Sequence, residues 1–380
     1  MRIVPVAGGK GGVGKSLLAA NLAIAVAQAG YRVVLADMDL GGSNLHLILG
    51  QPVVRAAIGS YLGNSGGDFN ALVQETGYEN LFFIPGDAEI PGLANLKSAQ
   101  KRMLIRRLHS IQADYLFVDL GAGTNQHILD FFLMSSHGIV VTTPTPTATV
   151  NAYLFLKNTV FRIMQSSVPA KSPAASYLDG LFKGKTSPPS PYITNILQEI
   201  ESIDSRNAAL ISENLRKFRP RLIFNMIDDP KDAEKAHRLR RSCQQYLNTE
   251  LMHLGIVYRD EMQDTALNAR LPILRYKPHS VLSQAIYRIA DKLVHLEAED
   301  DTVLNLEEID DSFDTAESEA ESDFDTKLQY IEDLLHTGAL STGDLVETVK
   351  NQHFEIMQLR RQNQLFKSKL VKAVEQGFQP

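Results

Sequence analysis

Short apolar runs alternate along the chain with longer segments whose apolar residues recur every three or four positions. The short runs predict buried strands, and the longer segments predict helices that pack on one face. The predicted strands are Arg2–Ala7, Arg32–Asp37, Leu81–Pro85, Tyr115–Leu120, Gly138–Thr143, Arg221–Ile227 and Leu254–Val257. The predicted helices include Leu17–Ala29, Lys97–Ile111 and Ser280–Leu296. This alternation is typical of an α/β fold, a mainly parallel twisted sheet with helices on both faces.

A glycine-rich loop, GGKGGVGKSLLAAN from Gly8 to Asn21, joins the first predicted strand to the first predicted helix. Strand, glycine-rich loop and helix in this order are typical of a phosphate-binding loop. Glycines let successive N–H groups approach a polyanion, and the helix adds the positive end of its dipole. Lys15 can reach the β- and γ-phosphates of a nucleotide, and the Ser16 hydroxyl can ligate Mg²⁺. The predicted nucleotide contacts in this loop are Gly11, Gly12, Val13, Gly14, Lys15, Ser16 and Leu17.

Three aspartates stand where predicted strands end. Asp37 and Asp39 follow one apolar strand, and Asp119 ends another strand just before the glycine-containing string GAGTNQ. In open α/β sheets the carboxyl ends of the strands are where ligand chemistry takes place. We therefore expect these carboxylates near the phosphate-binding loop, although a solvated turn remains the alternative for the Asp37–Asp39 pair.

The loop holds a second lysine, Lys10, and the string KGGVGKS resembles the deviant Walker A motif of the MinD/ParA family of P-loop ATPases. The resemblance implies that Lys10 reaches the phosphates of a partner subunit, so that ATP binding closes a homodimer. It also implies that Asp39 positions the attacking water, which makes Lys10, Lys15 and Asp39 the expected catalytic residues. Mg²⁺ would be held by Ser16, Asp39 and Asp119.

The same resemblance extends to three further positions. Asn44 matches a residue that supports the nucleotide site, and Gly121 matches one whose backbone senses the γ-phosphate. Asn225 matches the asparagine that reads the adenine edge, because a side-chain amide offers both a donor and an acceptor. A satisfied strand-end asparagine remains the alternative for Asn225. ATP and Mg²⁺ are the cofactors that this resemblance implies.

The segment TTPTPTATVNAYLFLK, residues 142–157, resembles the FlhG proteins of this family, also called FleN, which regulate flagella. The resemblance implies a slow ATPase that acts as a dimerisation switch and controls flagellar number or placement, with a protein partner stimulating hydrolysis. Two other functions remain open. A ParA-type factor would position a chromosome or other cargo through ATP-dependent, nonspecific DNA binding. A metabolic P-loop ligase would instead release a ligated small molecule.

Composition adds a compartment and a charge asymmetry. The 380-residue chain has a single cysteine, Cys243, which excludes a disulfide framework. It has no signal peptide and no uninterrupted apolar stretch of about 20 residues, which predicts a cytoplasmic protein and leaves peripheral contact with the inner face of the membrane open. The net charge is −6, but Glu297–Asp325 carries fourteen acidic residues and no Lys or Arg. The remaining 38 basic and 30 acidic residues give +8, which permits contact with nucleic acid or anionic lipid.

Three parts are predicted along the chain. Residues 1–296 form the ATPase domain, with an insertion at about 167–217 that begins as a mobile low-complexity run and continues as helix. This insertion is either a partner-specific element or a tolerated surface loop. Residues 297–326 form an acidic, disordered linker, and residues 327–380 form a helical tail.

The predicted tail carries apolar residues at heptad spacing. The seam consists of Leu345, Val349, Gln352, Ile356, Leu359, Asn363, Phe366, Leu370 and Ala373. This spacing favours a coiled coil, with packing on the ATPase domain or on a partner as the alternative. The final stretch, Phe366–Phe378, is similar in kind to the amphipathic membrane-targeting helix of MinD and FlhG, which leaves weak, ATP-dependent lipid binding open.

Overall fold

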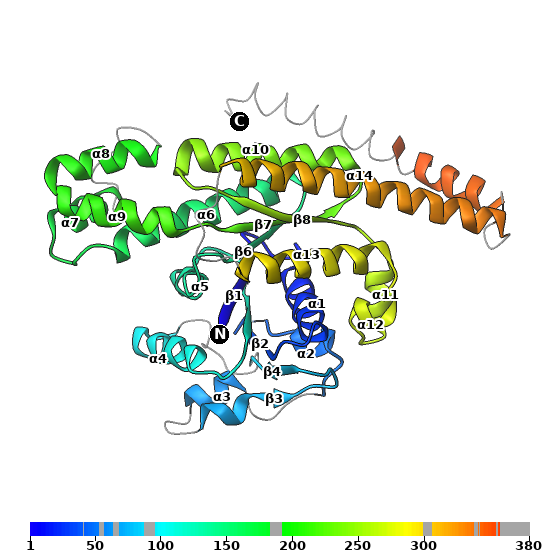
Figure 1. The fold of residues 1–380 in the computed structure, drawn as a ribbon, viewed down its shortest axis with the longest axis horizontal. Helices are drawn as coiled ribbons and strands as arrows, with labels where there is room; N and C mark the ends of the chain where they lie inside the picture. The colour runs from blue at the N-terminus through cyan, green and yellow to red at the C-terminus, as the bar shows by residue number, and fades with distance from the viewer. Residues whose placement is uncertain are drawn as a thin grey trace, which may run out of the picture. The chain divides into compact units, whose positions relative to one another are not determined.

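The computed structural model describes most of the chain, and two compact units divide it at Ser322. The described residues are 1–40, 42–52, 57–63, 68–86, 96–182, 192–298, 306–337, 341, 343–354 and 356–357. The first unit, Met1–Ser322, is built on one eight-stranded sheet in the order β3-β4-β2-β5-β1-β6-β7-β8 (Figure 1). The strands are β1 Arg2–Ala7, β2 Val33–Met38, β3 Gln74–Glu75, β4 Leu81–Ile84, β5 Tyr115–Leu120, β6 Ile139–Thr142, β7 Arg221–Ile227 and β8 Met252–Tyr258.

Every neighbouring pair of strands is parallel except β3 with β4, which is antiparallel. The predicted α/β class and mainly parallel sheet are therefore confirmed, and each of the seven predicted strands has a counterpart. The two-residue strand β3 was not predicted. It is short and only half-buried at one edge of the sheet, so its sequence carries no apolar run.

Helices cover both faces of the sheet, and α1 and α13 pack side by side on one of them (Figure 1). The α-helices are α1 Lys15–Gln28, α2 Leu45–Ile48, α3 Ile58–Gly63, α4 Ser98–His109, α5 Gln126–Phe132, α6 Pro146–Ser166, α7 Pro173–Phe182, α8 Ile193–Ile203, α9 Ser205–Lys217, α10 Glu234–Ser242, α11 Met262–Asn268, α12 Ile273–Tyr276, α13 Val281–Ala298 and α14 Leu306–His336. Short 3-10 helices are η1 Phe69–Leu72 and η2 Pro230–Ala233, and η3 Cys243–Leu247 is a π-helix.

The helix that follows the phosphate-binding loop is buried almost all round. Every residue of α1 from Leu18 to Ala27 is buried, and five of these ten residues are alanines. Small side chains let α1 approach the sheet and α13 closely, so the helix has no solvated stripe. Because α1 is fixed in the core, its first turn is fixed too. The loop that precedes this turn is therefore held in one place.

The start of the predicted insertion is more ordered than we expected. Helix α7 begins at Pro173, inside the low-complexity run that was predicted to be mobile, and Ala174 and Leu178 are fully buried. The Ser172 Oγ accepts a hydrogen bond from the N–H of Ala175, and proline is favoured in the first turn of a helix. These start signals outweigh the low-complexity composition. Part of the insertion, 183–191, lies outside the described residues.

The acidic segment 297–326 was expected to be a disordered linker after a domain ending at residue 296. The structure corrects this expectation, because α14 begins at Leu306 and the first compact unit runs to Ser322. The inward face of α14 carries four buried apolar residues, Ile309, Phe313, Ala316 and Ala320, at spacings of four, three and four. This stripe was missed because the acidic residues on the other faces dominate the composition of the segment.

Less of the predicted tail can be compared with the structure. Residues 343–354 are helical, and they include Leu345 and Val349 of the predicted heptad seam. The seam from Leu359 to Ala373 and the amphipathic stretch Phe366–Phe378 lie outside the described residues, so the coiled coil and the lipid contact stay predictions. Within the described part of the chain, no helix combines the length and the apolar character needed to cross a bilayer.

Candidate nucleotide-binding site

The glycine-rich loop lies between the carboxyl end of β1 and the first turn of α1. Gly12 and Gly14 have φ angles of 76° and 88°, a region that favours glycine. A Cβ added to Gly14 would lie 2.2 Å from Nδ2 of Asn225. A side chain at Gly14 is therefore excluded by both the backbone conformation and the space.

The start of the loop packs closely against the backbones of α6 and of the neighbouring strand β6. A Cβ on Gly9 would lie 2.0 Å from the backbone oxygen of Asn151 in α6, and one on Gly8 would lie 2.8 Å from the oxygen of Val141 in β6. Backbone atoms cannot move aside as a flexible side chain can. The glycines at these positions are thus needed for packing, in addition to any approach to a ligand.

The two lysines of the loop point to different surroundings. Lys15 is 7% exposed, and its charge reaches the buried Asp119. Lys10 is exposed, and its Nζ donates a hydrogen bond of 3.3 Å to Oγ1 of Thr147, in the first turn of α6. The structure thus separates the two lysines that the motif placed five residues apart.

Two of the predicted aspartates face each other in neighbouring strands. Asp37 of β2 and Asp119 of β5 are register partners at the carboxyl ends of the strands, and both are buried. Burial raises the pKa of Asp37 to about 6, against the hydrogen bond that Ser43 donates to it at 2.6 Å. Burial and then the charge of Asp37 raise the pKa of Asp119 to about 8, against the effects of Ser16 and Lys15.

The Oδ1 atom of Asp119 is buried and has no hydrogen-bond partner within the described residues. A buried carboxylate oxygen without a partner is costly. The hydroxyl of Ser16 lies within hydrogen-bonding reach of the same carboxylate. Carboxylate and hydroxyl oxygens are ligands that Mg²⁺ prefers. The residues present therefore fit a hard divalent cation beside the phosphate-binding loop.

Asp39 lies at the mouth of the site, where the two carboxylate-bearing loops meet. It is half-buried, and a Cβ added to Gly121, just after β5, would lie 3.0 Å from its Oδ1. The backbone N–H of Asp39 donates to Oδ1 of Asp37 at 3.1 Å. Movement of the loop after β5 would therefore disturb the carboxylate of Asp39.

The two predicted asparagines take different places. Asn225 is buried at the end of β7, and its Nδ2 donates a hydrogen bond of 2.9 Å to the backbone oxygen of Val13. Asn225 thus braces the phosphate-binding loop itself. Asn44 is exposed just before α2, and its Nδ2 donates to the backbone oxygen of Gly42 at 2.8 Å. The structure brings Asn225 into the site and leaves Asn44 at its edge.

Sequence reasoning missed Ser43 and Thr147. Ser43 is buried and donates to Asp37, and Thr147 accepts from Lys10. Ser43 stands two residues before the short helix α2. Serine is common at helix starts, so nothing in the sequence pointed to a bond with Asp37. Thr147 is one of several threonines in its segment, and nothing in their order distinguishes it.

Comparison with known proteins agrees with this geometry. The profile of a family described as the CobQ/CobB/MinD/ParA nucleotide binding domain matches residues 4–273. The chain belongs to this family. The matched range of this CobQ/CobB/MinD/ParA domain contains the glycine-rich loop, the three aspartates and Asn225.

Two flagellar proteins match most of the chain. The flagellum site-determining protein YlxH of Helicobacter pylori is 30% identical over 300 residues, which are 77% of this chain and 82% of that protein. The antiactivator FleN of Pseudomonas aeruginosa is 23% identical over 296 residues, 77% of this chain and 86% of FleN. The septum site-determining protein MinD of Synechocystis is 35% identical over 153 residues, 40% of this chain. The chain spans only 56% of that MinD.

Solved structures show the same fold. MinD of Pyrococcus horikoshii, solved in complex with Mg-ADP, has a TM-score of 0.53 at 18% identity and covers 80% of this chain and 99% of its own. A ParA family ATPase from Chlorobium tepidum has a TM-score of 0.51 at 20% identity, with 76% of this chain and 98% of its own covered. At these identities the likeness establishes the architecture of the CobQ/CobB/MinD/ParA domain.

Proposed function

We propose that this chain binds ATP with Mg²⁺, hydrolyses it slowly and closes a homodimer in its ATP-bound state. The observation that carries the proposal is the buried Oδ1 of Asp119, which has no partner within the described residues and lies beside Ser16 and Lys15. Mg²⁺ would neutralise charge on the phosphates and on these carboxylates. The relative solved with Mg-ADP supports the choice of ligand.

The chain's own residues suit a phosphoryl-transfer site. Lys15 stabilises charge on the β- and γ-phosphates, and the glycine-rich loop wraps them with N–H groups. Asp39, half-buried at the mouth of the site, orients the attacking water. Asn225 donates to the Val13 carbonyl through Nδ2, and its side-chain amide would also read the adenine edge. Asn44 supports the same site from its edge.

Lys10 suits a contact with a second subunit. Its hydrogen bond to Thr147 is exposed and 3.3 Å long. Such a bond contributes about 1 kcal/mol or less, so little opposes its release. Once released, the side chain is free to extend from the surface toward the phosphates bound by a partner copy.

We further propose that the switch regulates flagellar number or placement, and that a protein partner stimulates hydrolysis. Support comes from the matches to YlxH and FleN, each over 77% of this chain. A cytoplasmic location belongs to this proposal. Contact of the tail with the inner face of the membrane remains a prediction.

The test is light scattering of the purified Asp39→Ala protein with ATP and with ADP. We expect a monomer with ADP and a dimer with ATP, because a slowed variant keeps ATP in place. Adding Lys10→Ala should abolish the dimer, whereas Lys171→Ala, an exposed lysine outside the loop, should not. A mass that ignores the nucleotide would contradict the proposal. Formation of a ligated small molecule together with ADP, in place of ADP and phosphate alone, would favour a metabolic ligase.

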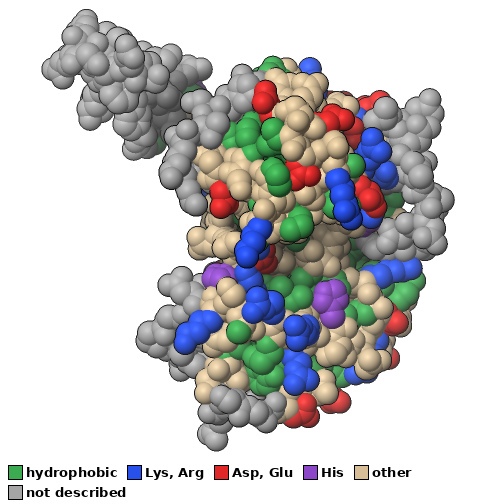
Figure 2. All heavy atoms as spheres, turned by 90° about the vertical axis from the view of Figure 1, so that its left-hand side faces the viewer, with side chains coloured by type: hydrophobic (Ala, Val, Ile, Leu, Met, Phe, Trp, Pro, Cys, Tyr) green, Lys and Arg blue, Asp and Glu red, His purple; other side chains and the backbone are tan. Residues whose placement is uncertain are grey.

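A second candidate function, nonspecific DNA binding, is favoured by one surface. Arg102, Arg106 and Arg107 of α4 are exposed and line a groove of about 480 Å³. No ion pair joins these three arginines to any described residue. Figure 2 shows the side of the molecule that lies on the left in Figure 1. Several Lys and Arg side chains lie on its lower half, at the height of α4 in Figure 1.

Lys101 and Asp130 anchor this surface. Lys101, on the inner side of α4, pairs with Asp130 of α5, and Arg162 of α6 pairs with the same carboxylate at 2.6 Å. The arginines are thus presented from a fixed helix. Fluorescence anisotropy with duplex DNA, with and without ATP, tests the function. Binding that weakens steeply with salt and with Arg106→Ala would support it. Equal binding by Arg106→Ala and wild type would exclude this surface.

A further inference from the structure

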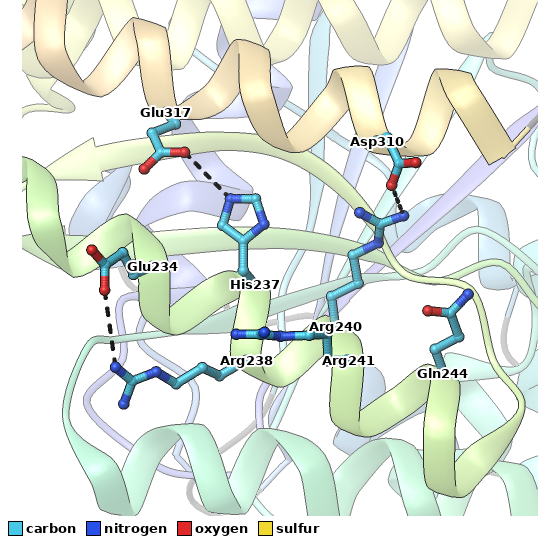
Figure 3. A pocket seen from close by; sticks show the side chains of 8 residues that line it. All are labelled: Glu234, His237, Arg238, Arg240, Arg241, Gln244, Asp310 and Glu317. Atoms are coloured by element: carbon cyan, nitrogen blue, oxygen red, sulfur yellow. Dashed lines mark hydrogen bonds and ion pairs between the residues drawn. The ribbon is translucent and has the colours of Figure 1, made fainter.

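A cavity of about 600 Å³ lies between α10 and α14, apart from the nucleotide site (Figure 3). It is lined by Glu234, His237, Arg238, Arg240, Arg241, Gln244, Asp310 and Glu317. The two helices are far apart in the sequence, and their facing side chains are almost all charged. Two of these cations already have partners, since Arg238 pairs with Glu234 at 3.9 Å and Arg240 pairs with Asp310.

Three side chains in this region each offer an atom that can ligate a metal ion. His237 on α10 points toward Glu317 on α14 (Figure 3), and Asp314 stands one helical turn before Glu317. One ligand atom from each of the three lies within 4.8 Å of the other two. The Nε2 atom of His237 is 3.5 Å from a carboxylate oxygen of Glu317. Asp314 has no ion pair with a described residue.

The contact between His237 and Glu317 leaves room for a ligand between its atoms. An imidazole with a proton on Nε2 would donate to the carboxylate, but a separation of 3.5 Å is too long for a good hydrogen bond. With the proton on Nδ1, the Nε2 lone pair faces the carboxylate and is open to a metal ion. A metal ion between these atoms would engage Asp314 at the same time.

The backbones that present these ligands are held firmly. Phe313, next to Asp314, is 1% exposed, and the Arg240 guanidinium lies 4.8 Å from the centre of its ring. Tyr258 of β8 donates a hydrogen bond of 2.8 Å to the backbone oxygen of Ala320, one turn beyond Glu317. Only the ligand side chains need to close, and the exposed Asp314 and half-exposed Glu317 can rotate freely. Such support is what a metal site requires.

We propose that His237, Asp314 and Glu317 bind one divalent transition-metal ion of borderline softness, such as Zn²⁺. One imidazole and two carboxylates suit this class of ion, with ligand atoms about 2.0–2.2 Å from it and water in the remaining position. The two carboxylates balance the charge of the ion. Arg241, the remaining cation on the rim, is exposed and screened by solvent. The ion fastens the first part of α14 to α10.

Isothermal titration calorimetry of the full, chelator-stripped chain with Zn²⁺ tests the site. The titration is made in the Asp119→Asn background, which removes the candidate magnesium ligand from the nucleotide site. We expect one equivalent bound, loss of that binding with His237→Ala, and a fall in affinity of about tenfold or more with Glu317→Gln. His279→Ala, an exposed histidine outside the cluster, should bind as before.

A second readout separates this site from chance surface binding. Co²⁺ in place of Zn²⁺ should give a visible absorption band that disappears with His237→Ala and persists with His279→Ala. Circular dichroism establishes that each variant is folded. The proposal is overturned if no stoichiometric binding occurs, or if His237→Ala binds Zn²⁺ as tightly as the background protein. Because neither readout uses ATP, failure here would leave the proposed ATPase function standing.

Discussion

Truncation of Phe313 is the strongest test of the fold. Its effect on stability decides whether the first part of α14 packs as part of the nucleotide-binding unit. Phe313 is 1% exposed. Its ring lies 4.9 Å from the ring of His253 in β8, and it carries the guanidinium of Arg240 on one face at 4.8 Å. Phe313→Ala removes the largest buried side chain on α14 and leaves an empty space against β8.

The size of the effect follows from this burial. Truncating a buried phenylalanine costs about 3–5 kcal/mol in free energy of unfolding. The lost contact with Arg240 adds about 0.5–1 kcal/mol. Relaxation of α14, a helix at the surface of the unit, offsets part of this, so we expect about 4 kcal/mol. A disordered segment would give a change close to zero, because no packing would be lost.

Urea unfolding of the full chain measures this difference. The chain has no tryptophan, so far-ultraviolet circular dichroism is the suitable probe. Phe354→Ala is the matched control, since Phe354 is 72% exposed in the helical stretch 343–354, and its change should stay within about 0.5 kcal/mol. If both variants unfold at the wild-type urea concentration, α14 does not pack as described and the reasoning fails.

Three further predictions concern the site and buried titratable groups. The pKa of Asp119 is raised to about 8, so the charged form is disfavoured in the folded state, and stability falls as the pH rises from about 4 through 8. In the absence of metal and nucleotide, Asp119→Asn should therefore melt at a higher temperature than wild type above pH 8. The increase in melting temperature should be smaller near pH 5. An equal increase at both pH values would contradict this prediction. Burial lowers the pKa of His253 to about 3, so the folded state resists its protonation, and stability falls as the pH drops from about 6.5 toward 3. His253→Phe should lose less stability than wild type between neutral pH and pH 4 in urea titrations; an equal loss in both proteins would contradict this. Gly9→Ala should abolish nucleotide binding in equilibrium dialysis, because the added methyl meets the Asn151 carbonyl at 2.0 Å; Gly63→Ala, where a Cβ meets nothing, should bind normally.

Much of this architecture could be predicted because its signals are local. Each buried strand of the parallel sheet is a short apolar run, and the loop from Gly8 to Ser16 has its own spacing of glycine and lysine. The end of a strand also locates a site, since parallel strands bring their carboxyl ends to one edge. Asp37 and Asp119 were expected near the phosphate-binding loop for this reason, whereas their pairing across neighbouring strands is a finding of the structure.

What could not be predicted depends on contacts between distant segments. The burial of Phe313 depends on β8 and α10, and the acidic residues around it suggest solvent when composition is averaged. The contact of Lys10 with Thr147 spans 137 positions, and no spacing within either segment records it. Ser43 is a local exception, since it lies only six residues from Asp37, but their hydrogen bond depends on the path of the loop between them.

The bond between Asn225 and the Val13 carbonyl has a consequence for synthesis on the ribosome. The two residues are 212 positions apart, so the loop cannot be braced until β7 has left the ribosome exit tunnel. At about 5–20 residues per second, this interval lasts roughly 10–40 s. Throughout it the nascent chain displays a glycine-rich loop that lacks one of its supports. A half-made chain should therefore be a poor competitor for nucleotide, and the phosphate-binding loop becomes fully supported only near the completion of the sheet.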